Sequence, residues 1–136
     1  MPRVTKTPSS RSRPSAPPAG LEPDLGRARK IVLDLLAIPG VSGKEKAVAD
    51  RIVTWLRDAG CPASAISFDT AHTKTPIKGE VGNLIVKLPG TVPGPRRLLM
   101  AHMDTVPVCL GAKPVVSGGH VKSADPKTGL GGDDRA

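Results

Sequence analysis

Aromatic residues are almost absent from this sequence, which contains one Trp, one Phe and no Tyr. Proteins that bind single-stranded nucleic acid stack its bases on aromatic side chains, so this shortage argues against that class. No apolar run approaches the roughly 20 residues of a membrane-spanning helix, and we expect no membrane partner. The two cysteines, Cys61 and Cys109, are too few for the disulfide framework of a small secreted protein. A cytoplasmic location is therefore expected.

Acidic residues are outnumbered, since 20 Lys and Arg against 12 Asp and Glu give a net charge of +8. Half of this excess lies in residues 1–20, which contain four basic residues and no acid. The remaining charge of +4 is ordinary for the surface of a small domain. A nucleic-acid-binding protein needs a basic stripe on folded structure, and none is visible in the sequence. We therefore expect no nucleic-acid partner.

The length of 136 residues allows one domain, preceded by a tail. Residues 1–20 contain five Pro and four Ser and have no periodic apolar pattern. Such a segment buries too little apolar surface to offset the entropy of ordering, which predicts disorder. Residues 21–136 are predicted to form the folded part.

Two helices are predicted at the start of this folded part. Apolar residues recur at helical spacing from Leu25 to Ile38, after Asp24 as an N-cap and before Pro39. A second apolar stripe runs through residues 48–59. For that helix we expect a capping box of Ser42 with Glu45 at the start and a left-handed Gly60 at the end.

The residues after these helices indicate strands. Alternation predicts strands around residues 66–68 and 84–88, and residues 115–121 fit a hairpin across a Gly-Gly turn. Residues 98–101 (LLMA) are apolar without alternation, which is typical of a strand covered on both faces. The predicted fold class is α/β, with helices flanking a central mixed sheet.

Two polar motifs could carry chemistry. His102 and Asp104 follow the predicted buried strand, and ligands bind beyond the carboxyl ends of strands in open α/β sheets. A carboxylate two residues from the imidazole could accept the proton of one ring nitrogen and leave the other for a metal. Near the end of the chain, Asp133 and Asp134 follow a Gly-rich stretch and could supply oxygen ligands to a cation. His72 lies in a polar loop and is expected to be solvated.

Taken together, these motifs resemble a known family, the co-catalytic zinc exopeptidases, which include peptidase T, aminoacylases, glutamate carboxypeptidases and acetylornithine deacetylase. The resemblance covers about residues 24–136 and rests on four stretches, which are residues 35–43 (LLAIPGVSG), 82–86 (GNLIV), 99–107 (LMAHMDTVP) and 131–136 (GGDDRA). The double acid followed by a basic residue is most similar to the peptidase T branch, although the family more often has Lys in place of Arg135.

The resemblance implies a role for each motif residue. His102 would be a zinc ligand, Asp104 the catalytic-site acid that orients it, and Asp133 the carboxylate that bridges two zinc ions. The implied activity is hydrolysis of the amide bond of a short peptide or N-acyl amino acid by a water activated between two metals. The fold implied is the N-terminal part of the catalytic domain, and the complete enzyme could be a homodimer. The substrate-binding residues are not identified.

The sequence contains no counterpart of the family's Glu-Glu pair, which supplies the general base and a further ligand. We therefore interpret the chain as a fragment of a longer enzyme and expect it to be inactive alone. Two other interpretations stay open. A catalytically inactive α/β binding module would not need two metals, and a basic nucleic-acid-binding protein would show salt-dependent affinity for DNA without residues 1–20.

Overall fold

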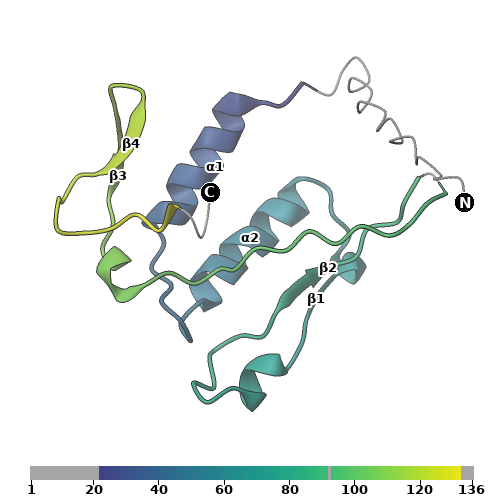
Figure 1. The fold of residues 1–136 in the computed structure, drawn as a ribbon. Coiled ribbons are helices and arrows are strands. Elements are labelled where there is room, and N and C mark those ends of the chain that lie inside the picture. The colour runs from purple at the N-terminus through teal and green to yellow at the C-terminus, as the bar shows by residue number, and fades with distance from the viewer. Residues whose placement is uncertain (1–21, 92, 133–136) are drawn as a thin grey trace, which may run out of the picture.

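A computed structural model of the chain describes residues 22–91 and 93–132. In this part, two helices and two small antiparallel sheets form a mixed architecture that is broadly α/β (Figure 1). The α/β class is therefore confirmed in its coarse form. The predicted disorder of residues 1–20 and the motif at Asp133 lie outside the described residues.

Both predicted helices are present. Helix α1 spans Leu25–Ala37, and the carboxylate of its N-cap, Asp24, accepts a hydrogen bond from the backbone N–H of Arg27 at 2.9 Å. Helix α2 spans Lys46–Asp58 and is followed by Gly60 with a φ of 86°, the left-handed conformation that ends many helices. Local capping chemistry thus sets the start of α1 and the end of α2.

The capping box predicted for α2 is wrong. The N-cap position is occupied by Glu45, which makes no side-chain capping bond. Its carboxylate accepts a hydrogen bond from the backbone N–H of Gly43 at 2.6 Å instead. Ser42 lies further from the helix, and its hydroxyl bonds to the distant Asp104. The Ser42 hydroxyl therefore donates to a distant carboxylate and does not accept a backbone N–H of α2.

The predicted strand pairs form as two separate sheets. Strand β1 (Ile66–Phe68) pairs antiparallel with β2 (Leu84–Val86). Strand β3 (Pro114–Ser117) pairs antiparallel with β4 (His120–Ser123). The turn of this second pair is Gly118-Gly119, with φ values of 58° and 78°. Positive φ at both positions is the requirement of the type I′ hairpin turn, so the Gly-Gly prediction is confirmed.

The predicted strand of residues 98–101 is wrong. The segment has no strand assignment, and Leu98, Leu99 and Met100 are 80%, 94% and 83% exposed. An apolar run predicts burial only where other elements cover it, and the described residues place no strand or helix over this one. The described part therefore has no central sheet, and the only parallel pairing within it is an isolated bridge between Val41 and Thr105.

The small core lies near the N-terminal end of α2. Its buried apolar residues come from both helices and from the short 3-10 turn Pro107–Cys109 with its following loop; they are Leu36, Val48, Ala49, Cys109 and Ala112. Cys61 and Cys109 are free thiols, as expected. Among the described residues, neither helix combines the length and apolar character needed to cross a membrane.

Candidate functional site

The connection between the two helices holds the segment that carries His102 and Asp104. The backbone N–H of Thr105 donates to the carbonyl of Gly40 at 2.9 Å, and Thr105 is buried at 6% exposure. Val41 and Thr105 form the isolated parallel bridge. Because the bridge lies directly after Asp104, it fixes the backbone from which this carboxylate projects.

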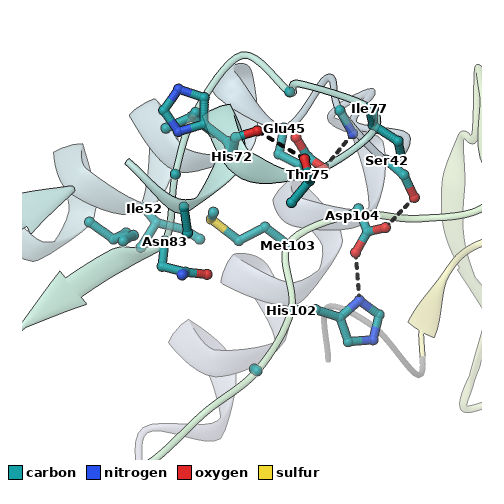
Figure 2. Close-up of a pocket in the computed structure, with 17 residues that line it drawn as sticks. Ser42, Glu45, Ile52, His72, Thr75, Ile77, Asn83, His102, Met103 and Asp104 are labelled. Carbon is teal, nitrogen blue, oxygen red and sulfur yellow. Dashed lines mark hydrogen bonds and ion pairs between the residues drawn. The ribbon is translucent and has the colours of Figure 1, made fainter. Parts of the chain in front are cut away.

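The structure brings His102 and Asp104 into contact (Figure 2). The ring nitrogen Nδ1 of His102 lies 3.0 Å from Oδ1 of Asp104. The hydroxyl of Ser42 donates a hydrogen bond to the other carboxylate oxygen, Oδ2. The His102 side chain is 59% exposed and the Asp104 side chain 32% exposed. The carboxylate is thus held between a hydroxyl and an imidazole that faces solvent.

The environment keeps Asp104 ionised. The Ser42 hydrogen bond lowers the pKa of the Asp104 carboxyl below its ordinary value of 3.8. The His102 contact also lowers it, whereas desolvation acts in the opposite direction. An ionised carboxylate is an acceptor only, so Nδ1 of His102 carries the proton in this contact. The nitrogen through which this ring would bind a metal is therefore Nε2.

These residues fit part of a zinc site. A neutral imidazole with Nδ1–H bonded to a carboxylate is the usual form of a zinc-ligating histidine. Zinc sites generally use three or four protein ligands. Within residues 22–91 and 93–132, no group of three or more His, Cys, Asp or Glu side chains could hold a metal ion. The third predicted residue, Asp133, lies outside the described residues.

A cavity of about 620 Å³ adjoins this pair. Its walls come from the helix connection, the loop of residues 71–84 and residues 101–104, and Ile52 of α2 also lines it. His72 lies on the far side of the cavity from His102 (Figure 2). The expectation of a solvated His72 is wrong, because the residue is half-buried and its Nδ1 is buried with no hydrogen-bond partner among the described residues.

A clasp at Asp69 closes the loop that forms this cavity wall. Oδ1 of Asp69 accepts hydrogen bonds from the backbone N–H groups of Ala71 at 3.0 Å and Asn83 at 2.8 Å. Its Oδ2 accepts from the Asn83 side-chain amide at 2.8 Å. The same loop is tied to the helix connection by a 3.0 Å ion pair between Glu80 and Lys44. One carboxylate therefore joins both ends of the loop.

We expect this clasp to weaken in acid. The hydrogen bonds from Asn83 and Ala71 lower the pKa of Asp69 below 3.8. A carboxyl whose pKa is lower in the folded state contributes stability that is present above pH 3.8 and is lost as the pH falls through the folded-state pKa. Hydrogen exchange of the Asn83 amide, followed from neutral pH downward, should accelerate in that range beyond its intrinsic pH dependence.

An Asp69→Asn variant provides the control, because its amide has the same shape and does not titrate in this range. Its Asn83 amide should be less protected at neutral pH and should lack the additional acid transition. A transition of equal size in both proteins would show that another group is responsible.

Ser42 and Asp69 are the site residues that sequence reasoning missed. The sequence predicts a local capping role for Ser42, whereas its partner in the structure is 62 positions away. No local pattern marks such a contact. Asp69 shows a weak signal, since an Asp that ends a strand before a loop often binds backbone N–H groups two residues ahead.

Comparisons with known proteins assign no family. No family model and no solved structure matches the chain. The uncharacterized protein YqjE of Bacillus subtilis strain 168 is 49% identical to it over 55 residues. This match covers 40% of the chain and 15% of the length of YqjE.

Proposed function

We propose that the chain carries part of the metal site of a zinc-dependent exopeptidase that hydrolyses the amide bond of short peptides. The observation that carries the proposal is the 3.0 Å contact between His102 Nδ1 and a carboxylate that is itself held by Ser42. The resemblance of residues 99–107 and 131–136 to peptidase T-like enzymes supports it. On this proposal, the described part belongs to the N-terminal portion of a cytoplasmic enzyme's catalytic domain.

Each residue of the proposed site has a separate task. His102 would bind zinc through Nε2, and Asp104 would keep its Nδ1 protonated and the ring correctly turned. Asp133 would contribute a carboxylate shared by two zinc ions. When bound, such a pair of ions supplies an activated water and polarises the carbonyl of the scissile bond.

The cavity beside His102 supports a small substrate. Its volume of about 620 Å³ lies within the roughly 300–1,000 Å³ that is usual for small-molecule pockets. A short peptide or an N-acyl amino acid has this size. Because Asp104 and Ser42 line the cavity, a ligand bound there would lie next to the proposed zinc ligand.

The proposal is tested by adding zinc to the full chain with isotope-labelled histidine and recording the ring signals by NMR. We expect His102 to respond at the lowest zinc concentration, ahead of His72 and the exposed His120 on β4. Asp133→Asn should raise the zinc concentration needed for this response. Asp58→Asn changes the net charge equally at an exposed position and should leave it unchanged.

Two outcomes would contradict the metal site. One is an equal response of all three histidines, which indicates nonspecific binding. The other is the absence of any His102 response, which favours the binding module without catalytic metals.

A further inference from the structure

We propose that Ser42 is a positioning residue that, through Asp104, fixes the orientation and tautomer of the His102 imidazole. The consequence for zinc rests on the proposed function, whereas the effect on the ring does not. Neither the composition of the sequence nor the motif around His102 points to this residue.

The first argument is the geometry of the carboxylate. Asp104 uses Oδ1 for His102 and Oδ2 for Ser42, so each oxygen has a separate partner. A carboxylate held at one oxygen can still rotate about the bond to its β-carbon. A second hydrogen bond on the other oxygen restricts that rotation, because the group is planar. The Ser42 contact therefore determines where Oδ1 points and which direction the ring must face to donate to it.

The second argument is that Ser42 is itself well placed to act as an anchor. The preceding two residues are bound to Thr105 through the 2.9 Å Gly40 contact and the Val41 bridge. The following residue, Gly43, has a φ of 84°, and a side chain there would collide with Ile77. The backbone on both sides of Ser42 is thus constrained, which fixes the position from which its hydroxyl reaches Asp104.

The third argument excludes other roles for the hydroxyl. Ser42 does not cap α2, whose N-cap is Glu45. A catalytic serine nucleophile gives its proton to an imidazole that a carboxylate supports from behind. Here the order is different, because Asp104 lies between Ser42 and His102 and the hydroxyl proton points to the carboxylate. The hydrogen bond that the hydroxyl makes is to Asp104, which is consistent with support of this carboxylate.

The experiment measures the His102 tautomer in the full chain by proton–nitrogen NMR at about pH 9, well above the ordinary imidazole pKa of about 6.5. We expect the Nδ1–H form to dominate, in contrast to a histidine side chain in water, which prefers Nε2–H. Ser42→Ala should shift the ring toward Nε2–H, and Ser42→Thr, which keeps the hydroxyl, should restore the original form. Ser67→Ala removes an exposed hydroxyl on β1 and should have no effect.

Zinc addition to the same proteins separates this inference from the proposed function. Loss of an outer partner of a metal-ligating histidine weakens metal binding by about 10–100-fold, and we expect Ser42→Ala to lie near the lower end because it acts through Asp104. An unchanged tautomer in Ser42→Ala, or identical tautomers in the Ala and Thr variants, overturns the role of Ser42. A tautomer that shifts as expected in a chain whose His102 does not respond to zinc upholds Ser42 and rejects the metal site.

Discussion

We expect Gly82→Ala to open the loop between Asp69 and Asn83 and to destabilise the chain by about 3 kcal/mol, at the upper end of the usual cost of overpacking. A β-carbon at Gly82 would lie 2.1 Å from the backbone oxygen of Asp69 and 2.8 Å from its carbonyl carbon. It would also lie 2.5 Å from the Asp69 Oδ1 that holds the clasp. Backbone atoms cannot move aside as a flexible side chain can, so the clasp itself must break.

Urea unfolding and hydrogen exchange of the Asn83 amide measure this effect. Gly94→Ala is the matched control, because nothing lies within 4 Å of a β-carbon built at Gly94. Its stability should stay within about 0.5 kcal/mol of the original chain, as is usual for surface substitutions. Equal losses in the two variants would show that the contact with Asp69 does not set the cost, because replacing Gly by Ala by itself restricts the unfolded chain and does not destabilise the fold.

The elements that were predictable from the sequence are those determined by neighbouring residues. Asp24 caps α1 by accepting a hydrogen bond from the N–H of Arg27, three positions later. Gly60 ends α2 by its left-handed conformation in the turn that follows the helix. The turn of Gly118-Gly119 likewise sets the register of β3 and β4. Each of these signals acts over a few residues, so its outcome does not depend on how the rest of the chain folds.

The features that could not be predicted depend on distant partners. Residues 98–101 have the composition of a buried strand, but burial requires covering elements, and their exposure shows that the described residues do not provide them. Ser42 fits a local capping pattern, in which its hydroxyl would accept from a backbone N–H. In the structure the hydroxyl donates to an ionised carboxylate 62 positions away, and such charge-assisted hydrogen bonds are among the strong ones. The pairing of His102 with Asp104 was accessible to sequence reasoning because only two positions separate them.

The largest effect on zinc binding among the described residues other than His102 itself is expected for Asp104→Ala. The variant removes the carboxylate that accepts the Nδ1 proton of His102 and orients the ring, and it removes a negative charge beside the ring. Loss of such a partner typically costs about 10–100-fold in metal affinity. The measurement is the zinc concentration that half-saturates the change in the His102 ring signals.

Asp50→Ala is the matched control, since it removes an equal charge from an exposed position on α2, where Asp50 pairs with Lys46 at 2.6 Å. It should bind zinc as the original chain does. An equal loss of zinc affinity in both variants would show that the change in net charge alone causes the effect. The double variant Ser42→Ala with Asp104→Ala should bind zinc no more weakly than Asp104→Ala alone. Because Ser42 acts through the Asp104 carboxylate, the effects of the two substitutions on zinc affinity should not add. A further loss of zinc affinity in the double variant would show that Ser42 affects zinc binding independently of Asp104.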